Sequence, residues 1–437
     1  MGYLVSLLLF AVGLLLHNTR KTWAAPDVFY CYLWGAISFF ASLRLFSMYG
    51  VSEKTWGIIL VGSIAFLIGV AFANRIAIKG TTQATQATLT VEHSAEVSFM
   101  KKRTFWIFTG LLYIPAIVGF VQTMQLLLSG HTLDEIRLAS YGITQITGFA
   151  KRSGYAWELF DSIQAGVEML VIATGIHYFV LDIKKNYTCI IAVMGLTILG
   201  SLTDGGRFGL AYTTIELLAC FSIYKSLGKK AGFTWSKKAK RTVSALVLVM
   251  IVVLLIVTFM RGAEIGELLQ KYYRYFCGSV VFFDKHVQQL EASGFWSYGF
   301  AGLYGYWIKI LPLLNAVFGM PYPETYLTAG SEVLDLQTHI AIGEGMYTNA
   351  FVTPFYALYA DLRWIGVILG MFAFGVLAGG IYKKVRTHAV GGGVVTYLII
   401  VQMLFKTLQM YPLTNASYAM VLILIVFLGR RYKLVTR

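Results

Sequence analysis

The fold is decided where an unbroken apolar run gives way to a long polar segment. Residues 243–260 read VSALVLVMIVVLLIVTFM, and residues 261–300 then read RGAEIGELLQKYYRYFCGSVVFFDKHVQQLEASGFWSYGF. An uncharged apolar run of about 18 residues predicts a helix that crosses a bilayer. The segment from Arg261 to Val352 is rich in Tyr and Trp and carries charges of both signs. We therefore expect it to form a large loop outside the membrane.

Similar apolar runs recur on both sides of this segment. They cover residues 4–16, 28–46, 56–73, 105–128, 157–180, 187–202, 208–223, 243–260, 364–381, 394–410 and 418–428. The chain is 57% hydrophobic and only 13% charged, whereas about a quarter of a soluble domain is charged. We predict an all-α polytopic membrane protein with about eleven transmembrane helices.

These helices and the loop divide the 437 residues into three predicted parts. Residues 1–260 should form an N-terminal transmembrane bundle of about eight helices. Residues 261–352 should form the large loop, and residues 353–437 should add about three more helices. We expect all three parts to fold as one integrated domain.

Basic residues between the apolar runs predict the orientation of the chain. Clusters at residues 20–21, 75–103, 184–185, 225–241, 383–386 and 430–437 all fall on one side of the predicted membrane. The positive-inside rule makes that side cytoplasmic, which leaves the amino terminus and the large loop outside. Topology and anionic lipid headgroups thus account for much of the net charge of +15, and we expect no nucleic-acid partner.

The usual motifs for metals, nucleotides and redox cofactors do not occur. The four cysteines form no CxxC pair, which indicates neither a disulfide framework nor a zinc site. The sequence also lacks a Walker A motif, HExxH and a dinucleotide fingerprint. We expect no cofactor and no metal.

Two stretches of the loop carry local patterns. In residues 265–290, apolar and aromatic residues recur at helical spacing, which predicts a short amphipathic helix on the membrane surface. Residues 300–318 are apolar but are interrupted by Gly305, Lys309 and Pro312. This pattern favours a re-entrant or interfacial segment over a spanning helix.

The first candidate site surrounds Arg207 in the stretch TDGGRFG, residues 203–209. Two glycines predict a tight turn with open N–H groups, and Arg207 opens the following helix. Backbone amides, helix dipole and guanidinium together can bind an anion. The alternative is a simple turn whose Arg anchors lipid headgroups.

The second candidate site is the stretch KYYRYF, residues 271–276, followed by Asp284, Lys285 and His286. On a helix, Lys271 and Arg274 share one face, and Tyr272 and Tyr275 share another. Two cations beside phenols suit a phosphate with an attached sugar. A surface helix that grips lipid headgroups would have a similar pattern.

The third candidate site runs from His339 to Arg363, at the entry of a late helix. It begins with two possible proton acceptors, His339 and Glu344, and ends with the cation Arg363. Between them lie Tyr347, Asn349, Tyr356 and Asp361. A hydroxyl that attacks a substrate must lose its proton to such a base. Mutual pairing of Asp361 with Arg363 is the simpler explanation for those two residues.

Polar residues also occur within the apolar runs. They are Asp161, Glu168, His177, Glu216, Gln402, Lys406 and Gln409. Such residues are costly in lipid and must face a cavity or one another. They can pair internally, for instance Lys406 with a carboxylate, or line the path of a proton-coupled transporter.

Three passages resemble the Wzy-type polymerases, which join the oligosaccharide repeat units of bacterial surface polysaccharides such as O-antigen. They are Gly206-Arg207; the segment 273–278 with Asp284; and Tyr347-Thr348 followed by Tyr356, Tyr359, Asp361 and Gly366. The layout of many spans with one large outer loop is similar as well. One departure is Leu362-Arg363, where the family tends to have Phe-Gly, and it can add a cation to the site.

The resemblance implies a metal-independent glycosyltransferase in the bacterial cytoplasmic membrane, with its active site facing the exterior. Donor and acceptor would be glycans on undecaprenyl pyrophosphate, with membrane lipids and a chain-length regulator as further partners. Arg207, Arg274, Lys271 and Arg363 would bind the pyrophosphate, whose negative charge grows as it leaves. The base would be His339, Glu344 or Asp284, and the glycan would contact Tyr273, Tyr347, Asn349, Tyr356 and Asp361.

Two alternatives remain open at this stage. A ligase of the O-antigen type would use the same donor with a different acceptor. A flippase or another transporter of lipid-linked glycans would use the polar residues within the spans, although a transporter gains little from a large outer loop.

Overall fold

The structure is a computed structural model that describes residues 1–75, 99–140, 146, 154–227, 237–261, 265–336, 338–349, 351–388 and 391–429. Most of the predicted inner segment 75–103 lies outside the described residues, as do part of the basic cluster at 225–241 and all of the cluster at 430–437. The regular secondary structure of the described part is helical apart from one two-stranded hairpin.

The first group of helices comprises α1 (Gly2–Arg20), α2 (Pro26–Leu43), α3 (Glu53–Arg75), α5 (Lys102–Leu128), α6 (Leu133–Ser140), α7 (Tyr155–Leu181), α8 (Tyr187–Asp204), α9 (Phe208–Leu227) and α10 (Lys237–Met260). The second comprises α11 (Leu268–Ser293), α12 (Tyr304–Phe318), α13 (Glu324–Thr328), α14 (Phe355–His388), α15 (Gly391–Lys406) and α16 (Ala416–Gly429). Strands β1 (Ile340–Gly343) and β2 (Met346–Thr348) pair antiparallel between α13 and α14.

A helix occupies each of the eleven predicted apolar runs. Among the described residues, α1, α3, α5, α7, α10 and α14 are long and apolar enough to cross a membrane. Shorter apolar stretches lie in α8, α15 and α16. The chain is therefore an all-α membrane protein with six candidate spanning helices, while eleven spans remain a prediction.

The chain forms two compact units, each made of separated segments. Unit 1 contains the described residues of Met1–Ala87, Leu268–His388 and Met403–Ile423. Unit 2 contains those of Thr88–Glu267, Ala389–Gln402 and Leu424–Arg437. Unit 1 thus includes residues from all three parts that the sequence predicted.

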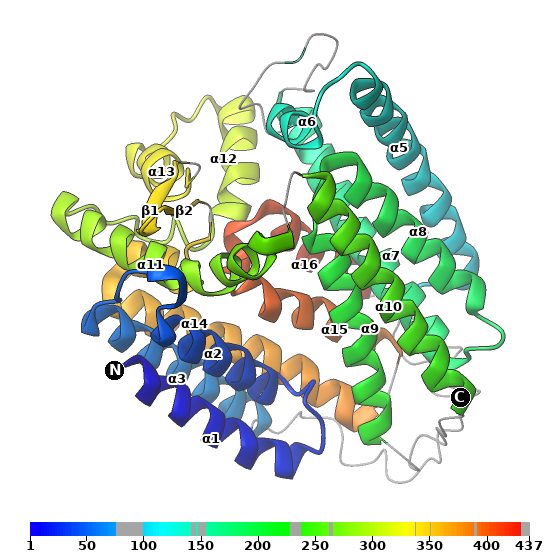
Figure 1. Cartoon of the computed structure of the whole chain (residues 1–437), viewed down its shortest axis with the longest axis horizontal. Coiled ribbons are helices and arrows are strands. Elements are labelled where there is room, and N and C mark those ends of the chain that lie inside the picture. Colours follow the sequence, from blue (N-terminus) through cyan, green and yellow to red (C-terminus); the bar gives the residue numbers. More distant parts are fainter. Residues whose placement is uncertain are drawn as a thin grey trace. The chain divides into compact units, whose positions relative to one another are not determined.

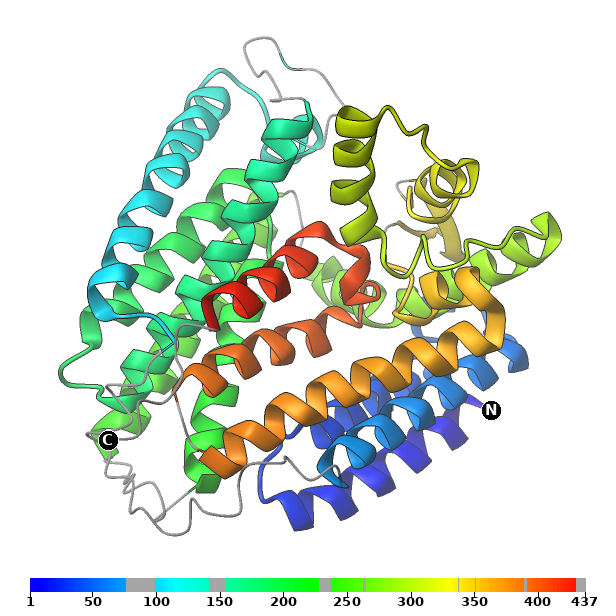
Figure 2. The same ribbon diagram turned by 180° about the vertical axis from the view of Figure 1, so that it is seen from behind.

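Unit 1 is built around the long helix α14, which packs along α3 (Figures 1 and 2). The two helices approach closely at glycines. A Cβ on Gly69 would lie 2.2 Å from the Phe372 carbonyl oxygen, and one on Gly375 would lie 2.2 Å from that of Phe66. Small residues at such crossings let helix backbones come together, which is how membrane helices gain packing energy. Helices α1 and α2 pack on each other in the same unit (Figure 1).

Unit 2 contains α5 and α7 to α10, which lie side by side (Figures 1 and 2). Helix α8 packs between α5 and α7 in this group and also contacts α9. Threonine hydroxyls inside the group bond to backbone carbonyls or to one another, as Thr197 does with Thr213 at 3.2 Å. Such local pairing satisfies polar groups that lipid could not.

The predicted amphipathic helix at residues 265–290 is present as α11. Its apolar side is buried, with Val280, Phe282 and Phe283 fully covered. It packs against α2, α3, α14 and both strands. Packing inside unit 1 therefore explains the helical spacing of its apolar residues, and its place on a membrane surface remains a prediction.

The interrupted apolar stretch at residues 300–318 forms α12, with Pro312 inside the helix. At one end, Gly305 lies against the backbone of Leu413 and Asn415 so closely that a Cβ would collide with it. Along the helix, Leu313 and Val317 are exposed. The segment is thus held at its start and presents an apolar surface farther on.

Candidate functional site

The candidate site is organised by a kink near the start of α14. Leu362 has φ −143° and ψ 31°, and Arg363 has φ 54° and ψ −134°. Glycine adopts positive φ readily, but a residue with a Cβ is strained there by about 1–3 kcal/mol. Strained backbone of this kind persists only where the surroundings hold it, and it clusters at functional sites.

The surroundings of the Arg363 guanidinium explain how the kink is held. Nη2 donates to the carbonyl oxygens of Phe295 at 2.7 Å and of Leu290 at 3.3 Å. Cζ lies 5.0 Å from the centre of the Trp296 ring and 5.4 Å from that of Tyr359. A cation at the carboxyl end of α11 also complements the helix dipole.

One nitrogen of the same guanidinium is left over. Nη1 is buried and has no hydrogen-bond partner among the described residues. A buried donor without an acceptor costs about 1–3 kcal/mol, and more when it is charged. Such a group needs an acceptor from outside the described part of the chain, such as a water molecule or a bound anion.

Next to Arg363, Glu291 balances part of the charge. It accepts a hydrogen bond from the Tyr359 hydroxyl at 2.5 Å and pairs with Lys54 of α3. Burial opposes ionisation of Glu291, but the bonds from Lys54 and Tyr359 and the charges of Lys54 and Arg363 outweigh it, so its pKa is lowered. Glu291 is therefore ionised and already occupied by Lys54 and Tyr359.

His286 lies one turn before Leu290 on α11 and faces the same part of α14. Its Nδ1 must carry the proton, because it bonds to the Phe282 carbonyl oxygen at 2.8 Å and a carbonyl can only accept. Burial lowers the pKa of His286, although the bond to Phe282 opposes this. Nε2 has no hydrogen-bond partner among the described residues, so it is a basic nitrogen with an available lone pair.

Tyr356 connects His286 to Arg363. The ring centres of His286 and Tyr356 are 5.5 Å apart at 71°, and Tyr356 is within electrostatic range of Arg363. Tyr356 and Tyr359 lie one turn apart on α14, and the Arg363 guanidinium is near both. We use the name Arg363 cluster for His286, Glu291, Trp296, Tyr356, Tyr359 and Arg363.

Asp361 lies in the same turn of α14 but points elsewhere. Its carboxylate accepts bonds from the Ser297 hydroxyl at 2.6 Å and from the backbone N–H groups of Gly299, Ala301 and Gly302 at 2.9–3.1 Å. It therefore fixes the turn 297–302 and makes no ion pair with Arg363. The ion pair between Asp361 and Arg363, which the sequence suggested as the simpler explanation, does not form.

Two other predicted site residues join α11 to its neighbours. Asp284 accepts bonds from the N–H and the hydroxyl of Ser52, the residue before α3, and from Gln288. Tyr273 donates to the Phe40 carbonyl oxygen at 2.8 Å and accepts from the Leu45 N–H at 3.0 Å. Both side chains are thus engaged in holding α11 against the rest of unit 1.

The hairpin brings together a different set. Glu344 lies exposed in the turn between β1 and β2, and His339 lies exposed just before β1. Tyr347 is also exposed, and Asn349 is half-buried where the chain leaves β2. The hairpin packs on α11 at Gly278, where a Cβ would lie 2.7 Å from Ile342.

Arg274 lies one turn before Gly278, at the edge of the hairpin. It is half-buried and forms no hydrogen bond or ion pair with the described residues, and its nearest aromatic contact is the Tyr275 ring at 5.9 Å. Lys271 is half-buried one turn earlier. From Arg274 to Leu290, where the Arg363 guanidinium binds, α11 extends sixteen residues, or about 24 Å. Arg274 and Arg363 therefore mark two separate cationic places.

Arg207 belongs to unit 2, and the predicted turn around it is present. Helix α8 ends at Asp204, Gly205 has φ 64°, and α9 begins at Phe208. The Arg207 Nη1 donates to the Thr258 hydroxyl at 3.4 Å. Arg261 closes the turn, since it bonds to the Gly205 carbonyl oxygen at 3.5 Å and pairs with Asp134 at 2.9 Å.

Unit 2 also contains a row of polar groups on α9. Glu216, Cys220 and Tyr224 follow one another at helical spacing, and the Tyr224 hydroxyl lies 2.8 Å from Nε2 of His177 on α7. Within the described part of the chain, Oε2 of Glu216 and Nδ1 of His177 are buried without partners. In unit 1, the Lys406 ammonium bonds to the Gln409 amide oxygen rather than to a carboxylate.

Two members of the Arg363 cluster, Glu291 and Trp296, were not among the predicted site residues. Their partners Tyr359 and Arg363 lie about seventy residues away along the chain, on α14. The only local signal was a Trp in a loop that was interpreted for its cations. His286 was predicted, but as part of the second candidate site and not as a neighbour of Arg363. Among the described residues, no three His, Cys, Asp or Glu side chains lie close enough to hold a metal ion.

Comparison of the chain with protein-family models, with curated proteins and with solved structures gives no match.

Proposed function

We propose that this protein is a membrane glycosyltransferase that joins oligosaccharide repeat units carried on undecaprenyl pyrophosphate, at the outer face of the bacterial cytoplasmic membrane. The observation that carries the proposal is the buried Nη1 of Arg363, a cationic donor without an acceptor in the described chain. A lipid-linked pyrophosphate supplies such an acceptor, and it can reach a site in a membrane bundle from the lipid phase.

In the proposed reaction, the acceptor hydroxyl attacks the anomeric carbon of the donor glycan. The bond between that carbon and the pyrophosphate oxygen breaks, and a new glycosidic bond forms. The lipid pyrophosphate leaves with the electron pair, and Arg363 stabilises its growing negative charge in a site shielded from water. His286 accepts the hydroxyl proton at Nε2, because its Nδ1 is already protonated.

The second cationic place gives the acceptor a site of its own. Both substrates of a polymerase carry a lipid diphosphate, but only the donor releases it. The reacting hydroxyl of the acceptor lies at the far end of its glycan, so its diphosphate must bind away from the reacting carbon. Arg274, about 24 Å from the Leu290 end of α11, satisfies this condition, and Lys271 lies on the same face.

The test is a transfer assay with purified protein, lipid-linked repeat units and detergent. We expect Arg363→Gln to abolish chain extension and Arg103→Gln to leave it unchanged, because Arg103 is an exposed arginine of α5 in unit 2. Both variants should be eluted as monodisperse protein. Extension at the normal rate by folded Arg363→Gln protein would contradict the proposal.

A ligase with the same donor is distinguished in cells. Loss of a polymerase leaves a single repeat unit attached to the surface acceptor. Loss of a ligase instead leaves long chains on the carrier lipid. A gel of the surface glycan from cells with and without the gene separates these outcomes.

A proton-coupled transporter of lipid-linked glycans is the second candidate, and one observation favours it. The row of Glu216, Cys220, Tyr224 and His177 places buried polar groups inside unit 2, and such groups often conduct protons. Transport requires two compartments, whereas transfer does not. Chain extension in detergent would therefore exclude pure transport.

A further inference from the structure

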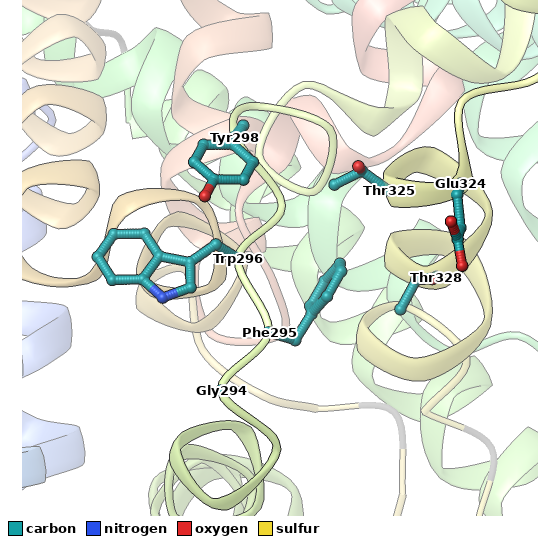
Figure 3. A pocket seen from close by; sticks show the side chains of 7 residues that line it. All are labelled: Gly294, Phe295, Trp296, Tyr298, Glu324, Thr325 and Thr328. Atoms are coloured by element: carbon teal, nitrogen blue, oxygen red, sulfur yellow. The ribbon is translucent and has the colours of Figure 1, made fainter.

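A pocket in unit 1 has the chemistry of a saccharide site. It has a volume of about 320 Å³ and is lined by Gly294, Phe295, Trp296, Tyr298, Glu324, Thr325 and Thr328 (Figure 3). The first four residues follow α11, and the other three belong to α13. Small-molecule sites occupy roughly 300–1,000 Å³, so this pocket can hold a short saccharide.

The aromatic side of the pocket is open to solvent. Trp296 is 39% exposed and Tyr298 is 67% exposed. Their ring centres are 6.3 Å apart, and the ring planes differ by only 24°. Figure 3 shows the two rings on one side of the segment, while Phe295 points across toward Thr328. Together the two rings give the pocket an exposed aromatic surface, called the platform below.

The platform is held rigidly before any ligand binds. Tyr298 has φ 48°, which is strained for a residue with a Cβ, and its N–H bonds to the Asp361 carbonyl oxygen. The Asp361 carboxylate fixes the following turn through three backbone N–H groups. The Trp296 ring lies against the Arg363 guanidinium. Preorganisation of this kind reduces the entropy that binding must overcome.

The opposite side supplies polar groups of a particular kind. Glu324 offers carboxylate oxygens and Thr325 offers a hydroxyl (Figure 3). Thr328, which also lines the pocket, carries a second hydroxyl one turn later on α13. Hydroxyl groups of a sugar can donate to the carboxylate and exchange hydrogen bonds with the threonines. The negative charge of Glu324 disfavours a phosphate or a carboxylate ligand in this pocket.

We propose that this pocket binds a neutral saccharide, with a sugar ring stacked on the exposed aromatic surface at Tyr298 and Trp296 and with hydroxyls of the saccharide bonded to Glu324, Thr325 and Thr328. The C–H groups on one face of a pyranose carry partial positive charge, and the face of an aromatic ring is negative. The proposal that a saccharide binds here depends only on the residues of this pocket. Its assignment to the glycan of the lipid-linked substrate rests on the proposed function.

The test is saturation-transfer-difference NMR on the purified full-length protein, with methyl glycosides of glucose, galactose, N-acetylglucosamine and rhamnose as probes. We expect transfer to the ring C–H protons of at least one glycoside. Tyr298→Asn should raise its dissociation constant about two- to twelvefold, the effect of losing one aromatic contact. Asparagine tolerates the positive φ at this position, so the variant should keep the turn.

Two comparison variants separate stacking from other effects. Tyr298→Phe keeps the ring and should bind as the wild type does. Tyr187→Asn removes a tyrosine that is 46% exposed at the start of α8 in unit 2, and it should also bind normally. Wild-type protein that binds none of the glycosides, or Tyr298→Asn protein that binds them as tightly as wild type, would overturn the proposal.

This experiment and the transfer assay can fail independently. Binding that depends on Tyr298 in a protein without transferase activity would support the saccharide pocket and reject the proposed function. Arg363-dependent chain extension with binding insensitive to Tyr298 would do the reverse.

Discussion

The backbone conformation at Arg363 reverses the usual order of stability of glycine and alanine in a helix. Inside a helix, glycine is less stable than alanine by about 1 kcal/mol. At φ 54° and ψ −134° the Cβ of alanine is strained, and glycine is not. We therefore expect Arg363→Gly protein to be more stable than Arg363→Ala protein.

The magnitude follows from comparing the two variants with each other. Both lose the same contacts to Leu290, Phe295, Trp296 and Tyr359, so these contributions cancel. What remains is the strain of the alanine backbone, about 1–3 kcal/mol, reduced by the greater chain entropy of unfolded glycine. We expect a net difference of about 1–2 kcal/mol in the free energy of unfolding.

The assay is SDS-induced unfolding of the purified variants in mixed micelles, at one ratio of protein to detergent. Ala373→Gly is the matched control, because Ala373 is exposed on the regular part of α14. This control should lose about 1 kcal/mol. If Arg363→Ala protein were as stable as Arg363→Gly protein, the kink would be absent, and the placement of the guanidinium would be wrong as well.

Three further predictions concern side chains of the candidate sites. His286→Gln should abolish chain extension. Because burial lowers the pKa of His286, which must be neutral to act as the base, the wild-type rate should fall to half only at a pH below about 6.5, the usual pKa of histidine. A half-maximal rate at a higher pH would exclude His286. Asp284→Ala should lower the free energy of unfolding by about 1–3 kcal/mol, because the bonds to Ser52 are lost. The rate per folded molecule in the transfer assay should be unchanged. A rate near zero in folded protein would make Asp284 the base. Arg207→Ala tests the pyrophosphate role that the family resemblance implies for Arg207. It should abolish long glycan chains on gels at normal protein abundance, and a normal ladder would remove Arg207 from the reaction.

The helices could be predicted from the sequence because an apolar run of spanning length is a local property. Each of the eleven runs contains a helix, and the turn at Gly205 follows from two adjacent glycines. The same holds for α11, whose apolar spacing repeats along one segment. Within these runs the differences lie at the ends: the α-helix in run 28–46 ends at Leu43, and Arg44 takes φ 50°. The short helices α6 and α13 were not predicted.

The arrangement of the candidate site could not be predicted in the same way. The kink at Arg363 depends on carbonyl oxygens of Leu290 and Phe295, which lie about seventy residues earlier. Asp361 looked like a partner for the neighbouring cation, yet four donors of the turn 297–302 satisfy it. A one-dimensional pattern records the residue types but not which distant backbone groups compete for them.

A structural role alone leaves part of Arg363 unexplained. Glycine would adopt the kink without strain, and contacts to Leu290 and Phe295 use only Nη2. The buried Nη1 remains unpaired in the described chain, at a cost that an anion would remove. The guanidinium also contacts Trp296, which lines the saccharide pocket. A lipid-linked glycan carries both an anion and a sugar. One such ligand would therefore place its anion at Nη1 and its sugar on the far side of Trp296.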